Sequence, residues 1–323
     1  MSWEWIDIIS HPLWMVSTVI LSIIVRSQRR GPWDPRACTV RLNGKTAIVT
    51  GANTGIGKFI ALDFARRGAR VILACRSEAR GNAALQEIRR LSGNDDVHLK
   101  LLDTSSLDSV RKFAAQILQE EKQLHILVNN AGASGLPRAL TADGIEVSFA
   151  TNHVGPFLLT NLLLDLLKRS APSRIVNVAS VNHWRGKVDF SHFHGENLSY
   201  KMDTVYNHTK LHNILCTNEL ARRLQNTGVT ANSLHPGVVM TEVMRNYSWL
   251  VRFLFSCVGF FFFKTPEEGA VSAIYCAVAE ETEGITGKYF DSDCFIALPS
   301  PLARDPALAT KDFEFCERLT AKL

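Results

Sequence analysis

A tyrosine and a lysine four positions apart, Tyr206 and Lys210, are the strongest candidates for chemistry in this sequence. An oxygen that is being reduced needs a proton, and a phenol with a pKa of about 10 exchanges one poorly near pH 7. A neighbouring ammonium favours the phenolate and lowers that pKa. Residues four apart share one helix face, so the pair predicts an acid/base site; the alternative is an amphipathic helix with a solvated lysine. Ser180 can hold a substrate oxygen by a hydrogen bond, or it is only a turn residue after a strand.

A second candidate is the glycine-rich segment that directly follows the apolar run 46–50. A glycine-rich turn between a strand and a helix lets the backbone approach a pyrophosphate, whose charge is met by the free N–H groups at the helix start. A tight turn without a ligand also explains three glycines, but its place at the first strand-to-helix connection favours a dinucleotide. The predicted contacts come from Gly51, Asn53, Thr54, Gly55, Ile56 and Gly57.

Short β-branched apolar runs alternate along the chain with longer stretches of helical spacing. Such alternation is typical of parallel strands joined by crossover helices. We therefore expect an α/β fold, a Rossmann-type doubly wound parallel sheet, in a single domain over residues 44–323. Strands are expected at Thr46–Thr50, Val71–Cys75, Val97–Leu102, Ile126–Asn130, Ile175–Val178 and Val229–Leu234, and helices at Lys58–Arg67, Leu107–Lys122, Pro156–Lys168, Leu211–Leu224 and Pro266–Ala279.

The glycine spacing T-G-x-x-x-G-x-G resembles that of the short-chain dehydrogenase/reductases, and further motifs follow in that family's order over about residues 43–290. They are Asn129-Asn130-Ala131-Gly132, Asn152-His153-Val154-Gly155, Ser180, Tyr206-x-x-x-Lys210 and Pro236-Gly237. The resemblance implies a catalytic tetrad of Asn152, Ser180, Tyr206 and Lys210, in which Asn152 supports a water that links Lys210 to solvent; otherwise Asn152 is a helix cap. It also implies cofactor contacts from Asp103, Asn130, Ala131, Gly132, Tyr206, Lys210, Pro236, Gly237, Val239 and Thr241.

The residue after the second predicted strand bears on which dinucleotide binds. Rossmann-type sites select NAD with an acidic residue at this strand end and accept NADP with an arginine there. Here Arg76 occupies the position and no Asp or Glu does. We therefore expect NADP(H), the alternative being a surface arginine in the first turn of the next helix.

The amino end has the composition of a membrane anchor. The 18 residues from Ile8 to Val25 are almost wholly apolar, with arginines only after them. This length just crosses a hydrocarbon core, and the trailing positive charge predicts a cytosolic main domain. We expect an anchor over residues 1–30 and a linker over 31–43; a buried or interfacial helix is the alternative. The expected location is the endoplasmic reticulum membrane with the domain facing the cytosol, or otherwise a lipid droplet or mitochondrial membrane.

The composition excludes several kinds of partner. The net charge of +5 includes five arginines between residues 26 and 41, so the remaining chain is nearly neutral and nucleic acid is not expected. The seven cysteines are odd in number and lack metal-ligand spacing, which indicates reduced thiols. His192 and His194 have no partner pair with ligand spacing, so we expect loop residues and no metal.

Residues 240–264 are expected to form an apolar lid over the substrate. Trp249 to Phe263 is strongly apolar but too short to span a bilayer. The segment is either a packed helix pair over the core or a membrane-touching cover for a long apolar substrate.

The closest resemblance within the family is to the membrane-bound retinol/retinal dehydrogenase branch and its dehydrogenase/reductase sister members. It rests on GANTGIGK at 51–58, LACR at 73–76, KQLHIL at 122–127 and HPGVV at 235–239. It implies hydride transfer between NADP(H) and an apolar aldehyde or alcohol, with retinal/retinol as the expected pair. The alternatives are a reductase of steroid or lipid carbonyls, and a catalytically silent membrane-anchored dinucleotide-binding scaffold. Family members commonly associate through the helices that carry Asn152 and Tyr206, so the resemblance also allows a homo-oligomer.

Overall fold

The computed structural model describes residues 33–195, 202–239 and 262–321, together with Ser17, Asn246, Trp249 and Gly259. The predicted membrane anchor and most of the predicted lid therefore lie outside the described residues, as does Thr241. Within the part of the chain that is described, no helix combines the length and the apolar character needed to cross a bilayer.

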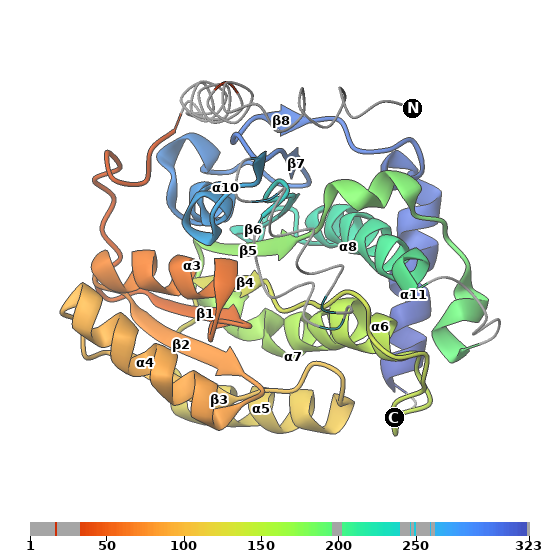
Figure 1. The fold of residues 1–323 in the computed structure, drawn as a ribbon, viewed down its shortest axis with the longest axis horizontal. Helices are drawn as coiled ribbons and strands as arrows, with labels where there is room; N and C mark the ends of the chain where they lie inside the picture. The colour runs from red at the N-terminus through yellow and green to blue at the C-terminus, as the bar shows by residue number, and fades with distance from the viewer. Residues whose placement is uncertain are drawn as a thin grey trace, which may run out of the picture.

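In the described residues, eight strands form one sheet in the order β3-β2-β1-β4-β5-β6-β7-β8 (Figure 1). All neighbours are parallel except β7 and β8, which are antiparallel. The expected doubly wound parallel sheet is confirmed, and each of the six predicted strands ends within two residues of its predicted bounds. The strands are β1 (Thr46–Thr50), β2 (Arg70–Cys75), β3 (Val97–Leu101), β4 (Ile126–Asn129), β5 (Ser173–Val178), β6 (Val229–Leu234), β7 (Tyr289–Phe290) and β8 (Ile296–Ala297).

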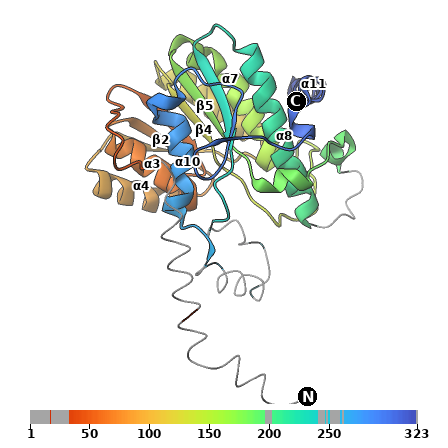
Figure 2. The same ribbon diagram turned by 90° about the horizontal axis from the view of Figure 1, so that it is seen from above.

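Helices cover both faces of the sheet, as Figure 2 shows. On one face α3, α4 and α10 enclose an apolar core, and on the other α5, α7 and α8 enclose a second core that α11 completes from outside. Strands buried from both sides need apolar residues on both faces, which explains the continuous apolar run of β1. The helices are α3 (Gly55–Arg66), α4 (Glu78–Ser92), α5 (Leu107–Glu120), α6 (Val147–Phe149), α7 (Gly155–Arg169), α8 (Met202–Arg223), α10 (Pro266–Val278) and α11 (Pro306–Ala321).

The segment predicted as a linker is packed against the domain over its described part, residues 33–43. The guanidinium of Arg67 donates to the carbonyl oxygens of Pro35, Cys38 and Val40 at 2.9–3.0 Å. Arg67 is itself only 5% exposed and is held by the carboxylate of Asp63 at 2.6 Å. The segment therefore follows a fixed path across the surface of the domain.

Helix α4 follows β2, as the alternation of strands and helical stretches predicted, although no bounds were given for it; its apolar face is narrow and holds only Gly81, Ala84, Leu85 and Ile88. At the carboxyl end, α11 has 16 residues. One expectation about local structure needs correction. The segment Phe190–His194, which contains His192 and His194, forms a short 3-10 helix and not a loop.

Candidate active site

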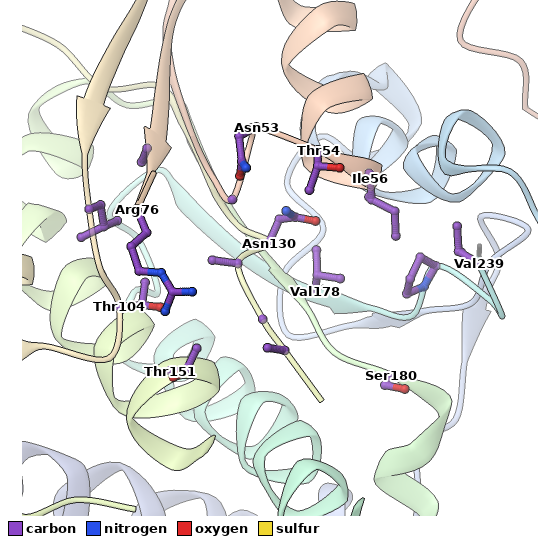
Figure 3. Close-up of a pocket in the computed structure, with 18 of the residues that line it drawn as sticks. Asn53, Thr54, Ile56, Arg76, Thr104, Asn130, Thr151, Val178, Ser180 and Val239 are labelled. Carbon is purple, nitrogen blue, oxygen red and sulfur yellow. The ribbon is translucent and has the colours of Figure 1, made fainter. Parts of the chain in front are cut away.

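A pocket of about 220 Å³ lies at the carboxyl ends of the strands, where β1 and β4 are neighbours and the strand order reverses. Ligands of doubly wound sheets bind at this switch point. Figure 3 shows the pocket as elongated, with Arg76 beside Thr104 at one end and Ser180 at the other. It brings together sixteen of the predicted residues, namely Gly51, Asn53, Thr54, Gly55, Ile56, Arg76, Asp103, Asn130, Ala131, Gly132, Ser180, Tyr206, Lys210, Pro236, Gly237 and Val239.

The glycine-rich turn has the geometry of an anion cradle. Gly51 and Gly55 have φ angles of +67° and +56°, which favour glycine. A side chain on Gly51 would meet the Cα of Ala131 at 3.0 Å and fill the cradle. Thr54 is the N-cap of α3, but its side chain makes no capping bond and the first turn holds no acid. The first N–H groups of α3 are thus left to bind a pyrophosphate.

Gly57 was predicted to contact the cofactor, but the structure places it behind the pocket wall. It is not among the residues that line the pocket. A Cβ at this position would lie 2.6 Å from the carbonyl oxygen of Gly51. Gly57 therefore allows α3 to pack closely against the turn.

A polar bridge between β1 and β4 fixes the next part of the wall. The Thr50 hydroxyl oxygen accepts from the backbone N–H groups of Asn130 and Ala131 at 3.0 and 2.9 Å. The side-chain amide of Asn130 donates back to the Thr50 carbonyl at 2.9 Å. These bonds set the loop after β4 against the glycine-rich turn.

The Arg76 end of the pocket carries positive charge. Arg76 and Arg80 both line it, with the N-cap Ser77 between them. The only carboxylate lining the described pocket, that of Asp103, is 4.0 Å from the Arg76 guanidinium and also accepts from Ser105. This arrangement suits a phosphate group. Ser77 and Arg80 were not predicted from the sequence, although a serine before a helical stretch is a recognisable capping signal.

Lys210 and Tyr206 lie one turn apart on α8 and face the same pocket. The Lys210 ammonium is 5.5 Å from the centre of the Tyr206 ring and donates to the carbonyl oxygen of Val178 at 2.8 Å. Burial lowers the pKa of Lys210 to about 8. The ammonium is thus held where it can favour the phenolate of Tyr206.

Ser180 follows β5 and begins the 3-10 helix Val181–Arg185. Its hydroxyl oxygen accepts from the N–H of Asn182 at 3.2 Å. The turn function that we considered for this serine is therefore present. It does not exclude the other role, because the hydroxyl proton remains available to donate to a substrate oxygen in the pocket.

Asn152 lies one layer behind the other three members of the tetrad and does not line the pocket. It sits in a π-helical turn, Ala150–Val154, and is not a helix cap. Its side chain exchanges two hydrogen bonds with the backbone of Ala133, at 2.8 and 2.9 Å. A Cβ on the intervening Gly132 would lie 3.3 Å from Asn152 Oδ1 and 3.4 Å from Lys210 Nζ. Gly132 thus lets Asn152 approach the reacting end of the pocket.

The remaining wall comes from the segment after β6. Gly237 has a φ of +85°, and its N–H donates to His235 Nδ1 at 3.2 Å. The carbonyl of Val238 accepts from the N–H of Lys264 at 2.9 Å. These contacts place Pro236, Gly237 and Val239 opposite the glycine-rich turn.

The structure also brings together residues that sequence reasoning did not connect. Thr104 and Thr151 line the pocket although each belongs to a different loop or helix. Beside the tetrad, His153, Asp312 and Cys316 place one donor atom each within 4.8 Å of one another, in a buried cluster. Asp312 and Cys316 lie four residues apart on α11, but no spacing signal could have joined them to His153, which lies more than 150 residues earlier in the sequence.

Comparison with known proteins identifies close relatives. Residues 45–249 match the family model described as short chain dehydrogenase. The chain is 46% identical over 301 residues to retinol dehydrogenase 11 of Mus musculus, covering 93% of this chain and 94% of that protein. It is 49% identical over 274 residues to retinol dehydrogenase 12 of Homo sapiens, covering 84% and 85%.

Solved structures agree with the fold. An uncharacterised protein from Mycobacterium paratuberculosis superposes with a TM-score of 0.72 at 30% identity, covering 90% of this chain and 98% of that chain. A short chain dehydrogenase from Burkholderia cenocepacia J2315 in complex with NADP gives a TM-score of 0.63 at 26% identity, covering 79% and 98%.

Proposed function

Because the chain belongs to the short-chain dehydrogenase family and is thus an oxidoreductase that binds NAD(P)(H), we propose that it transfers a hydride between NADP(H) and an apolar aldehyde or alcohol, retinal/retinol foremost. The observation that carries the proposal is that Arg76, Ser180, Tyr206 and Lys210 all line one pocket. Figure 3 shows Arg76 and Ser180 on opposite sides of it.

The preference for NADP(H) rests on the charge at the Arg76 end. Arg76, Ser77 and Arg80 offer two guanidinium groups and a hydroxyl to a ribose 2′-phosphate. The carboxylate of Asp103 faces Arg76 and so pairs with the cation instead of lying unopposed. A dehydrogenase solved in complex with NADP is among the structures that share this fold, which is consistent with the preference.

The reacting end supplies the proton chemistry. When bound, the nicotinamide supplies or accepts the hydride. Ser180 donates a hydrogen bond to the substrate carbonyl oxygen, and Tyr206 gives that oxygen its proton. Lys210 favours the resulting phenolate by its charge. Asn152 holds Ala133 and Gly132 against Lys210, and supports the water through which Lys210 exchanges protons with solvent.

The substrate class rests on two features. Relatives that are 43–49% identical over most of the chain are named retinol dehydrogenases. Beside Ser180 and after β6, Val181, Trp184 and Val238 are 43–56% exposed, which favours an apolar substrate. A steroid or lipid carbonyl fits the same features and is the second candidate. A silent scaffold is disfavoured because dinucleotide binding alone needs no tyrosine, lysine and serine around one pocket.

The membrane placement stays a proposal on the sequence alone. Residues 1–30 anchor the chain in the endoplasmic reticulum membrane, with residues 44–323 facing the cytosol and residues 240–264 covering the substrate. Association into a homo-oligomer belongs to the same proposal.

The test is NADPH oxidation by the full chain in membranes, with all-trans-retinal, a medium-chain lipid aldehyde and an oxidosteroid as substrates and NADH as the comparison cofactor. Tyr206→Phe should abolish turnover and leave NADPH binding unchanged. Tyr275→Phe is the matched control, because Tyr275 lies on α10, packs against Trp33 and does not line the pocket. NADPH binding without turnover of any carbonyl would refute the proposal, and full activity of Tyr206→Phe would refute the mechanism.

A further inference from the structure

A line of hydrogen bonds connects the carboxyl-terminal helix α11 to the tetrad. Cys316 Sγ lies 3.3 Å from His153 Nε2. His153 Nδ1 lies 2.9 Å from Asn213 Oδ1. The amide nitrogen of Asn213 lies 3.1 Å from the main-chain carbonyl oxygen of Asn152. Cys316, His153 and Asn152 are each at most 2% exposed, so water does not compete for these bonds.

The donor and acceptor of every hydrogen bond in this line follow from its last acceptor, the main-chain carbonyl oxygen of Asn152. A carbonyl oxygen only accepts, so the Asn213 amide must donate to Asn152 and turn its own oxygen toward His153. His153 must then carry its proton on Nδ1. This leaves Nε2 as an acceptor for the Cys316 thiol. Burial favours the same neutral imidazole and protonated thiol, because it lowers the pKa of His153 to about 4 and raises the pKa of Cys316 well above its usual range.

The main-chain carbonyl of Asn152 lacks its usual helical hydrogen bond. In an α-helix it would accept from the backbone N–H four residues later, but that residue is Pro156, which has no backbone N–H. The π-helical turn Ala150–Val154 coincides with this gap. The Asn213 amide fills it from the neighbouring helix α8.

A buried hydrogen bond between a histidine and an aspartate holds α11 against α8. His212, adjacent to Asn213, has its Nδ1 2.6 Å from Asp312 Oδ1, and both side chains are fully buried. The other Asp312 oxygen lies 3.7 Å from His153 Nε2, beyond hydrogen-bond distance. The pair therefore fixes α11 against α8 one turn away from Cys316.

We propose that Asn213 is a positioning residue for the tetrad, and that His153 and Cys316 hold it in its working orientation. The inference rests on the proposed function, because it acts through Asn152. The side chain of Asn152 is hydrogen-bonded to the backbone of Ala133. The preceding residue, Gly132, lies between Asn152 and Lys210. A displaced Asn152 would therefore disturb the proton path at Lys210 and leave the Arg76 end of the pocket unchanged.

The main test is Asn213→Asp, which keeps an acceptor for His153 but turns an oxygen toward the Asn152 carbonyl. The matched control is Asn218→Asp, since Asn218 also lies on α8 and donates its amide to a main-chain carbonyl, that of Ala303, at 2.9 Å. We expect about a tenfold lower single-turnover rate for Asn213→Asp with saturating NADPH. The NADPH dissociation constant should change less than twofold, and the control should keep its rate.

A second readout needs no substrate and separates this inference from the proposed function. The Ala133 N–H donates to Asn152 Oδ1, so its hydrogen exchange should accelerate in Asn213→Asp and not in Asn218→Asp. If the wild-type chain reduces no carbonyl, the proposed function fails while the exchange still tests the positioning. Unchanged exchange in Asn213→Asp would overturn the inference, as would faster exchange with an unchanged rate in an active enzyme.

A further pair of variants covers the case in which Asn213→Asp does not fold. Cys316→Ser keeps a donor to His153 and should retain the wild-type rate within about twofold, whereas Cys316→Ala should be several-fold slower. Equal rates for the two variants would overturn the role given to Cys316 and His153.

Discussion

Replacing Arg76 with alanine should weaken use of NADPH and leave use of NADH almost unchanged. Arg76 lines the pocket at the end of β2, and its side chain is 55% exposed, so it can meet a 2′-phosphate without a large rearrangement. Its counter-charge, the carboxylate of Asp103, lies at 4.0 Å, which is the limit of an ion pair. Little interaction energy within the protein is therefore lost when Arg76 turns to a phosphate.

The size of the effect has two parts. A hydrogen bond to a charged group contributes about 1.5–3 kcal/mol, and partial exposure favours the lower half of that range. Removing Arg76 also leaves the Asp103 carboxylate unopposed near the phosphate, which adds roughly 0.5–1 kcal/mol of repulsion. Together these give about 2–3 kcal/mol, or roughly a thirty- to 150-fold loss in kcat/KM for NADPH. NADH lacks the phosphate and should change less than about twofold.

The assay compares kcat/KM for both cofactors with one aldehyde. Arg90→Ala is the control, because Arg90 is exposed on the neighbouring helix α4 and does not line the pocket. Adding Asp103→Asn to Arg76→Ala should restore a few-fold of the NADPH activity by removing the repulsion. Equal losses with NADH and NADPH would show that Arg76 supports the fold of the pocket, and the reasoning from the 2′-phosphate would be wrong.

Three further predictions concern stability. Lys210→Met should raise the free energy of unfolding of the cofactor-free protein by about 1–3 kcal/mol below pH 8, because it removes a buried ammonium whose pKa is lowered to about 8. The folded protein bears that penalty in full below pH 8 and loses it as pH rises toward 10.5, so denaturant titrations of variant and wild type should converge there; a constant difference would contradict this. Gly57→Ala should lower both the melting temperature and NADPH affinity, since its methyl group would lie 2.6 Å from the Gly51 carbonyl oxygen; wild-type binding by fluorescence titration would argue against the close packing. Arg67→Met should lower the free energy of unfolding by about 3–5 kcal/mol, because it leaves the Asp63 carboxylate unpaired. Adding Asp63→Asn should recover part of this loss in the same denaturant titrations. If it recovers none, the bonds of Arg67 to the backbone of residues 35–40 account for the loss.

The sheet could be predicted from the sequence because its central strands are apolar on both faces. The run Thr46–Thr50 is fully buried, and its predicted and observed bounds are the same. The glycine-rich turn could be predicted because it follows that run without a gap. The bounds of helix α4 could not be predicted because only four of its residues are buried, two of them Gly81 and Ala84. Its polar surface weakens the apolar periodicity on which such predictions depend.

The site was predictable where a motif carries it and not where distant segments meet. Tyr206 and Lys210 belong to one helix, so their spacing in the sequence also gives their spacing in space. Asn152 lies behind Gly132 because it belongs to a π-helical turn, and that turn was not predicted from the local sequence. Asp312 and Cys316 lie on the buried face of α11, but a polar residue in the sequence does not indicate burial. Their hydrogen-bond partners, His212 for Asp312 and His153 for Cys316, are brought to them only by the fold.

The contacts of Arg67 with residues 35–40 restrict more than the local backbone. A flexible tether would let a globular domain tumble over a wide range of angles relative to whatever precedes it. Here the described chain is held from Trp33 onward, where its ring packs edge-on against Tyr275 of α10. If the residues before Trp33 enter a bilayer as proposed, residues 33–43 add no slack between the membrane and the domain. The pocket would then stay within a short distance of the lipid, where an apolar substrate that diffuses within the leaflet can reach it.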